Sequence, residues 1–209
     1  MIVKAHGRFI KKDDFVYRTD TYLKFGESDQ IIGACVLCNP GSSSLKNKTE
    51  EEYLINYDDG KYEIEGELKL DDTMEQVRDI LMEAYGNELK GKFKIFNTFT
   101  IRNSNMDKAK ELLKNEDVDK DLLFQDFRRY KDEFSDFRYI LIGWGCEDFS
   151  VLKAEKKRWL KFINDNNINH IGIKGKKSPH YYHPLPRIAK DRKRYKGVIT
   201  EAIKEVIKE

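Results

Sequence analysis

Short apolar runs alternate along the chain with stretches in which apolar residues recur at helical spacing. Four runs predict strands of a sheet: residues 31–38, 92–96, 139–142 and 170–173. The other stretches predict helices at about 72–86, 106–115, 121–134, 151–164 and from 197 onward. Strands that alternate with helices are typical of an α/β protein. We therefore expect a three-layer α/β/α fold with a central, mainly parallel four-stranded sheet.

Two segments near the start of the chain add to this expectation. Residues 8–10 and 17–25, which flank a Lys-Lys-Asp-Asp sequence, predict an N-terminal hairpin or edge strands. Residues 42–70 are polar and acidic, and they predict a long excursion with at most a short hairpin at 58–60. Asp72 is the expected N-cap of the helix that follows.

Composition places the chain among folded proteins. Hydrophobic residues make up 39% and charged residues 36% of the 209 positions, so apolar side chains are too frequent for a disordered chain. The length predicts a single domain over residues 1–209, with an acidic insertion at about 45–70. No apolar run approaches the roughly 20 residues that span a bilayer, and the first residues lack the pattern of a signal peptide. We expect a cytoplasmic protein with no membrane partner.

Charge is divided unevenly along the chain, although the formal net charge is only +2. Residues 50–72 carry ten acidic side chains against two lysines, whereas residues 174–196 carry nine Lys or Arg side chains against Asp191 alone. A concentrated cationic segment suits phosphate groups. The alternative is a solvated, lysine-rich tail that precedes the last helix.

The cysteines bear on metal and redox chemistry. Cys35, Cys38 and Cys146 form an odd and sparse set, which argues against a disulfide framework and against a four-cysteine iron–sulfur cluster. Together with His180 and His183, the first two provide four possible zinc ligands. Residues 35 and 38 of a regular strand point to opposite faces, which disfavours that site.

Neither a phosphate-binding P-loop nor a Gly-x-Ser-x-Gly hydrolase elbow is present. We expect no metal and no cofactor.

Ligands of parallel α/β sheets bind beyond the carboxyl ends of the strands, so the residues that follow each strand are candidates. These are residues 39–44, 97–98 with Arg102, 143–145 and 178–187. Asn97 offers an amide donor and a carbonyl acceptor to a base edge, Trp144 a stacking wall, and His183 a donor for a carbonyl. Gly41 and the serines after it offer N–H groups and hydroxyls to phosphate or to an attacking water. Turn chemistry alone also favours such residues, and Trp144 fits a core position equally well.

These strand ends resemble motifs of the uracil-DNA glycosylase superfamily, in the same order over residues 31–187. Residues 38–44 (Cys-Asn-Pro-Gly-Ser-Ser-Ser) look like the Asn-Pro-Gly motif of its mismatch-specific and single-strand-selective branches. Residues 95–102 resemble the strand whose Asn-Thr pair holds the pyrimidine edge. Residues 140–145 are similar to the Leu-Leu-Trp-Gly strand end, and residues 183–186 (His-Pro-Leu-Pro) to the His-Pro-Ser-Pro motif. The same motifs also resemble an uncharacterised bacterial and phage domain family.

The resemblance implies a DNA glycosylase that hydrolyses the N-glycosidic bond of a uracil-like or modified pyrimidine, hydroxymethylated or glucosylated cytosine included. It implies that Asn39 positions the hydrolytic water and that His183 contacts the base and the DNA backbone. The implied base-binding residues are Asn97, Pro40, Gly41 and Trp144. The implied DNA-backbone residues are Ser42, Ser43, Arg102, Pro184, Pro186, Arg187, Lys190, Arg192 and Arg194. DNA is the implied partner, in repair or in defence against phage, and no cofactor is implied.

The chain departs from the superfamily at Leu185, where a serine is usual, and in the long acidic segment after Ser44. The tyrosines of that segment, Tyr53, Tyr57 and Tyr62, suit a wider pocket, a lid or a partner surface. The identity of the base and the strandedness of the substrate stay open. The alternative function is a catalytically silent nucleic-acid or nucleotide binding protein on the same fold. Only the glycosylase produces abasic sites.

Overall fold

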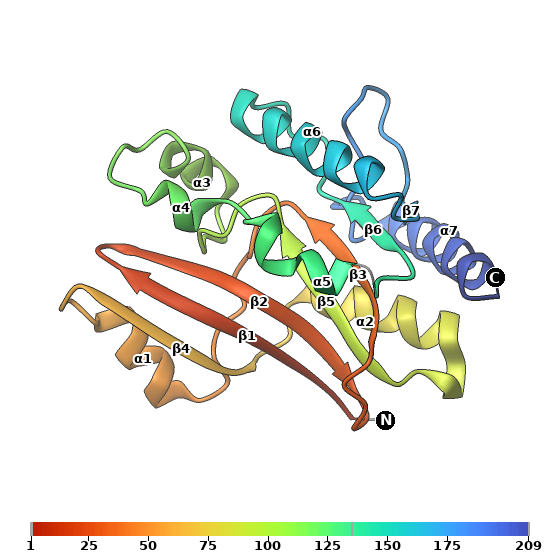
Figure 1. Ribbon diagram of the computed structural model, residues 1–209, viewed down its shortest axis with the longest axis horizontal. Helices are drawn as coiled ribbons and strands as arrows, with labels where there is room; N and C mark the ends of the chain where they lie inside the picture. Colours follow the sequence, from red (N-terminus) through yellow and green to blue (C-terminus); the bar gives the residue numbers. More distant parts are fainter. Residues whose placement is uncertain (1, 135, 209) are drawn as a thin grey trace.

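The computed structural model describes residues 2–134 and 136–208. Seven strands within these residues form one mixed sheet in the order β4-β1-β2-β5-β3-β6-β7 (Figure 1). The strands are β1 (Val3–Lys12), β2 (Phe15–Phe25), β3 (Ile31–Leu37), β4 (Lys61–Leu68), β5 (Gly91–Asn97), β6 (Ile140–Gly143) and β7 (His170–Ile171). The helices are α1 (Lys48–Asn56), α2 (Asp72–Tyr85), α3 (Met106–Leu112), α4 (Lys120–Leu123), α5 (Lys131–Phe134), α6 (Ser150–Asp165) and α7 (Ala189–Lys208), with short 3-10 turns η1 (Gly86–Glu88) and η2 (Phe127–Tyr130).

The α/β class is confirmed, but the expected four-stranded, mainly parallel sheet is wrong. The four apolar runs do form β3, β5, β6 and β7, which pair with one another in parallel. However, β2 pairs antiparallel with β5, and β1 and β4 continue the sheet in antiparallel fashion. The predicted N-terminal hairpin is confirmed, because β1 pairs antiparallel with β2. Both strands are interior strands rather than edge strands, since β4 and β5 flank them. The edge beyond them is β4.

Helices cover both faces of the parallel half of the sheet (Figure 1). Successive residues of β3 alternate between the two cores that result. Cys35 and Leu37 belong to the core that includes residues of α2 and α7, whereas Ala34 and Val36 belong to the core that includes Trp159 of α6. Because both faces of the strand are buried, its apolar run is continuous.

Helix boundaries follow capping chemistry and differ slightly from expectation. Asp71, not Asp72, is the N-cap of α2, since its carboxylate accepts a 2.9 Å hydrogen bond from the N–H of Met74. The helix ends at Gly86, whose φ of 58° favours glycine. Helix α7 begins at Ala189 rather than near Gly197. Lysine and arginine are good helix formers. The cations of residues 190–196 are therefore in the first half of this helix, whereas Lys174, Lys176, Lys177 and Arg187 precede it.

The expected helix at 121–134 is instead three short pieces, α4, η2 and α5. Asp119 caps α4 by accepting from the N–H groups of Asp121 and Leu122. Phe124 is extended, and Asp126 then accepts from the N–H of Arg128 to start the next turn. Aspartate side chains that bond to nearby N–H groups compete with a continuous helix, which the spacing of apolar residues does not reveal.

The acidic segment is not an irregular excursion. Asn47 caps α1, whose Leu54 is fully buried in the core, and β4 pairs with β1 over eight residue pairs. Tyr53, Tyr57 and Tyr62 pack against one another, with ring centroids 5.0–5.9 Å apart. The segment is therefore the edge of the sheet with one helix on it, and the tyrosines join α1 to β4.

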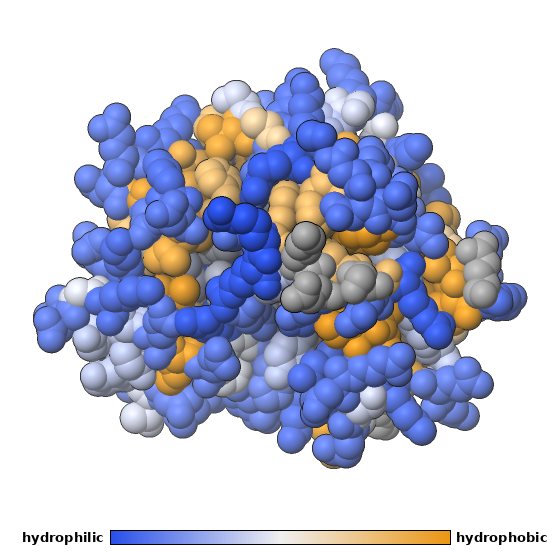
Figure 2. All heavy atoms as spheres, in the orientation of Figure 1, coloured by the Kyte–Doolittle hydropathy of each residue, from blue (hydrophilic) through white to orange (hydrophobic). Residues whose placement is uncertain are grey.

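Figure 2 shows hydrophilic side chains over most of one face of the molecule, with smaller hydrophobic areas between them. Among the described residues, no helix combines the length and the apolar character needed to cross a membrane.

Candidate active site

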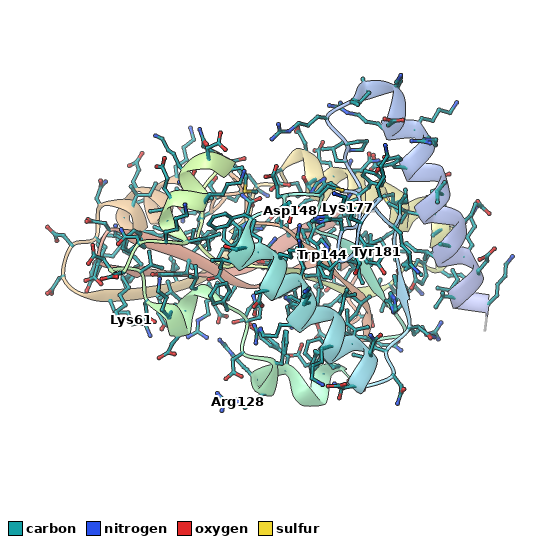
Figure 3. The ribbon with its side chains drawn as sticks, turned by 90° about the horizontal axis from the view of Figure 1, so that it is seen from above. Lys61, Arg128, Trp144, Asp148, Lys177 and Tyr181 are labelled. Atoms are coloured by element: carbon teal, nitrogen blue, oxygen red, sulfur yellow. The ribbon has the colours of Figure 1, made fainter. Side chains whose placement is uncertain are left out.

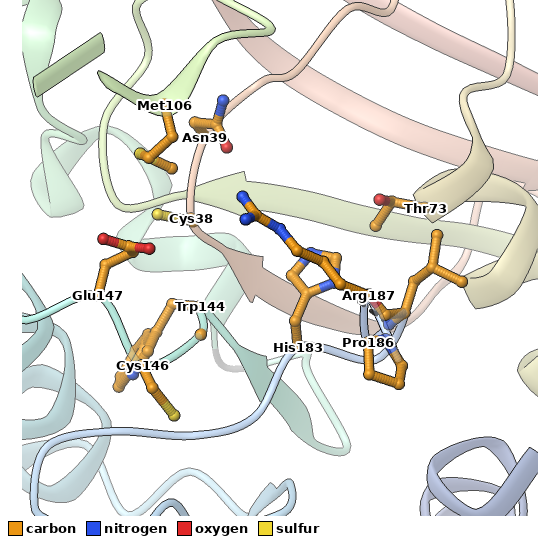
Figure 4. A pocket seen from close by; sticks show the side chains of 12 residues that line it. Cys38, Asn39, Thr73, Met106, Trp144, Cys146, Glu147, His183, Pro186 and Arg187 are labelled. Atoms are coloured by element: carbon orange, nitrogen blue, oxygen red, sulfur yellow. Dashed lines mark hydrogen bonds between the residues drawn. The ribbon is translucent and has the colours of Figure 1, made fainter. Parts of the chain in front are cut away.

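A cavity of about 350 Å³ lies beyond the carboxyl ends of β3 and β6 (Figure 4). Residues of the β3 end, the β6 end and the loop between β7 and α7 form most of its wall, as a parallel sheet requires. The lining residues are Cys38, Asn39, Thr73, Met106, Trp144, Gly145, Cys146, Glu147, His183, Leu185, Pro186 and Arg187. The structure thus brings together the predicted residues Asn39, Trp144, His183, Pro186 and Arg187.

Asn39 is held in a defined orientation. Its Nδ2 donates a 2.8 Å hydrogen bond to the backbone carbonyl of Asn103. The amide is planar, so this bond turns Oδ1 the other way, and Figure 4 shows the oxygen on the side of the cavity. A side-chain carbonyl in this position can accept a hydrogen bond from a water or a ligand.

His183 is held by its own loop. Its Nδ1 lies 3.2 Å from the N–H and 3.0 Å from the carbonyl oxygen of Leu185. Burial lowers the pKa of His183, while the Leu185 contact and Asp71 act in the opposite direction. The ring is therefore neutral near pH 7. When Nδ1 accepts from the Leu185 N–H, the single proton is on Nε2, which is then a hydrogen-bond donor to the cavity. When Nδ1 instead donates to the Leu185 carbonyl oxygen, Nε2 is an acceptor.

Trp144 contributes to the cavity wall, but most of its ring belongs to the core. The side chain is fully buried, its Nε1 donates a 2.8 Å hydrogen bond to the carbonyl of Pro179, and Tyr181 meets it edge-on at 5.7 Å. Figure 3 shows Trp144 and Tyr181 beside each other. The core interpretation of Trp144 therefore describes its ring better than a stacking platform does.

Asn97 lies outside the cavity lining. It is the last residue of β5 and only 2% exposed, and its Nδ2 has no hydrogen-bond partner in the part of the chain that the structure describes. The next residue, Thr98, hydrogen-bonds through both its N–H and its hydroxyl to the carbonyl of Cys38. These bonds join the end of β5 to the end of β3.

The residues of the first loop that were predicted to contact the DNA backbone line a second hollow of about 700 Å³. Gly41, Ser42 and Ser43 belong to it, and it shares Asn39 and Arg187 with the main cavity. The Ser43 hydroxyl donates to the carbonyl of Lys69 at 2.9 Å, which fixes the loop. Pro40 is buried beside these residues and lines neither hollow.

The predicted basic residues fall into two groups. Arg102 does not line the main cavity and pairs with Glu51 at 2.7 Å. Arg187 lines the cavity, and the exposed residues Lys190, Arg192 and Arg194 follow it on the first turns of α7. Arg192 donates to the carbonyl of Pro186 at 3.2 Å. The basic run therefore begins at the cavity and continues along α7.

Neither Pro184 nor Cys35 lines the main cavity. Pro184 packs so closely on Gly143 that a Cβ there would lie 2.6 Å from the proline Cδ. Cys38 lines the cavity and Cys35 is in the core on one face of β3; burial raises the pKa of Cys38 to about 11. Within residues 2–134 and 136–208, no group of three or more His, Cys, Asp or Glu side chains could hold a metal ion.

Glu147 is the cavity residue of greatest chemical interest that the sequence interpretation missed. Its Oε2 lies 2.6 Å from Nζ of Lys110 in α3. Thr73, Met106 and Cys146 were also missed. The signal for Glu147 was its place two residues beyond the Gly-Trp-Gly sequence that ends β6. Loop residues up to two positions beyond a strand-ending turn are therefore also candidates for such a cavity.

Comparison with known proteins covers part of this site. A family model described as a protein of unknown function (DUF1643) matches residues 64–185, more than half of the chain. The match begins within β4 and ends at Leu185, so it includes Glu147 and His183 and leaves out Asn39. No curated protein and no solved structure matches the chain.

Proposed function

For this chain, which belongs to the DUF1643 family, we propose the function of a DNA glycosylase on a uracil-DNA-glycosylase-like fold. The reaction is hydrolysis of the N-glycosidic bond of a uracil-like or modified pyrimidine, which leaves an abasic site. The observation that carries the proposal is the convergence of Asn39 and His183 on one cavity at the ends of parallel strands.

The size of the cavity suits a single base. Its volume of about 350 Å³ lies at the lower end of the range of small-ligand sites. A base inside a duplex cannot reach such a cavity, so the nucleotide must leave the stack, at a cost of roughly a few kcal/mol. Arg187 at the wall and the basic first half of α7 suit the phosphates that flank such a nucleotide.

Asn39 and His183 would then serve the two ends of the reaction. An amide cannot act as a base, so the Asn39 carbonyl orients the attacking water without taking its proton. The departing base gains negative charge on an exocyclic carbonyl oxygen, and neutral His183 in the form that carries its proton on Nε2 stabilises that charge by donating from Nε2. A donor aimed at developing charge in this way is commonly worth about 100-fold or more in rate.

Asn97 gives further support. An unpaired, buried amide donor is uncommon in folded proteins and calls for a partner. Asn97 is opposite Leu37 in the β3–β5 register, next to the loop that carries Asn39. A carbonyl of an extruded base is a suitable acceptor once the side chain is uncovered, so we retain Asn97 as a base-binding residue in the proposal.

The test is the formation of abasic sites. The protein is incubated with DNAs that carry uracil, a thymine mismatch, or hydroxymethylated or glucosylated cytosine, and is then treated with alkali. Strand scission at one of these bases is expected. Normal DNA binding with no scission on any of them would instead establish the silent binder.

A further inference from the structure

Glu147 is the only carboxylate among the described residues that line the cavity. It comes from the loop after β6, whereas His183 comes from the loop after β7. Figure 4 shows Glu147 beside Cys38, on the other side of the cavity from His183. A base bound against His183 would therefore have its sugar accessible to the side that carries Asn39 and Glu147.

Two lysines fix this residue. Lys110 pairs with Oε2 at 2.6 Å, and Oε1 has no ion-pair partner among the described residues. Lys156 is fully buried, and its Nζ donates 2.9 Å hydrogen bonds to the backbone carbonyls of Gly145 and Glu147. A buried ammonium group is costly without such bonds, so Lys156 holds the loop in place.

The proposed reaction requires a proton acceptor that Asn39 and His183 do not provide. Water becomes a competent nucleophile only if it loses a proton as it bonds to carbon. The Asn39 amide has no basic atom, and His183 is engaged as a donor to the base. A carboxylate is a common acceptor for this step.

We propose that Glu147 is the catalytic residue that accepts the proton of the attacking water, an inference that rests on the proposed function. As the water oxygen bonds to C1′ of the deoxyribose, the C1′–N bond breaks and its electron pair leaves with the base. The water proton passes to Oε1 of Glu147. The products are an abasic deoxyribose, the base anion and a protonated Glu147, which returns its proton to the base or to solvent.

Lys110 positions the carboxylate and does not react. The hydrogen bond that Lys110 donates to Glu147 raises the pKa of Lys110, as does the charge of that carboxylate. The amine therefore stays protonated and has no lone pair for attack on C1′. Treatment with borohydride during the reaction is expected to trap no covalent complex with DNA, and the abasic site stays intact until alkali is added.

The experiment compares the parent protein with Glu147→Gln, Glu147→Ala and Lys110→Met, on the DNA that the parent cleaves best. General base catalysis commonly contributes about 100-fold or more. Glu147→Gln is expected to lose at least that factor in single-turnover rate while it binds DNA and unfolds thermally like the parent. Formate should restore part of the rate to Glu147→Ala. Lys110→Met keeps the carboxylate, and its single-turnover rate should decrease by about tenfold or less.

The outcomes separate two failures. An active parent with a Glu147→Gln rate within threefold of it would overturn the role of Glu147 and leave the proposed function intact. Equal losses of rate and stability in Glu147→Gln and Lys110→Met, with no rescue by formate, would show that the pair is structural. A parent that cleaves no DNA would remove the proposed function and, with it, this inference.

Discussion

The two halves of the sheet differ in what they can build. In the parallel half, β3 and β6 run side by side and end at the same edge, and the loops that follow them form the cavity. In the antiparallel half, β1, β2 and β4 run in alternate directions, so their loops are divided between the two edges. None of the described residues in those three strands lines the cavity.

The difference shows why the cavity lies in one half of the sheet and not in the other. The loops that follow the carboxyl ends of parallel strands all lie at the same edge of the sheet. Antiparallel strands instead extend the sheet. Substitutions in matched pairs, one in each half, can test whether this division holds.

The largest expected effect on stability is in the parallel half. Trp159 is fully buried among Phe96, Phe127 and Phe134, and replacement of a buried tryptophan by alanine costs about 3–5 kcal/mol. Its counterpart is Tyr53→Ala on α1, an exposed aromatic whose loss should cost about 1 kcal/mol or less. Urea denaturation of both variants measures the free energy of unfolding. Equal losses would mean that α1 and β4 are as important to the fold as the core under α6.

A smaller effect is expected from glycines that are packed against a neighbour. A Cβ at Gly143 would lie 2.6 Å from the ring of Pro184, which cannot move without the cavity loop. Gly143→Ala should cost about 1–3 kcal/mol and lower any activity of the cavity. At Gly66 in β4 the Cβ would lie 2.8 Å from a methyl group of Leu45, the end of a flexible side chain. Gly66→Ala should unfold close to the parent and leave the cavity unchanged.

A still smaller effect is expected on DNA affinity. Each phosphate contact contributes about −0.9 to the slope of log affinity against log salt concentration. Lys190→Gln and Arg192→Gln, which neutralise exposed cations of α7, should each make the slope shallower by about that amount. Lys61→Gln, at the exposed start of β4, is the control and should leave it unchanged. The slope is measured from fluorescence anisotropy titrations at several salt concentrations.

The smallest expected effect is a pH dependence of stability. Burial is the main cause that lowers the pKa of both His183 and His6 in the folded protein. The unfolded chain therefore binds more protons than the folded one as the pH falls below about 6.5. Stability should decrease from pH 7 to pH 5. His183→Gln should flatten this dependence more than His6→Gln, because His6 lies on the more open surface of β1.

Much of the parallel half could be predicted from sequence. Residues 31–38 and 139–142 form continuous apolar runs because both faces of β3 and β6 are buried. The edge strand β4 was missed, although Tyr62, Ile64 and Leu68 occupy alternate positions on one of its faces. The glutamates between them made the segment look like a solvated excursion. An edge strand that alternates acidic and apolar residues needs to be distinguished from an acidic loop by this period of two.

The site could be predicted in part. Asn39 and His183 were expected at strand ends and do meet at the cavity. Asn97 was expected beside them but is buried outside the cavity lining, next to Thr98, whose hydroxyl donates to the carbonyl of Cys38. No local pattern reports such a long-range hydrogen bond. Glu147 was not predicted because it lies two residues beyond the turn that ends β6, and its side chain reaches back to the cavity.

The most direct test of the central claim is single-turnover cleavage by Asn39→Ala and the parent on the same panel of modified DNAs. The account predicts that the parent forms abasic sites at one of the bases. It predicts that the rate of Asn39→Ala is about one hundredth of the parent rate or lower, with unchanged DNA affinity and thermal stability. Equal rates for the two proteins would contradict the role of the cavity in hydrolysis, as would a parent that binds DNA and forms no abasic site at all.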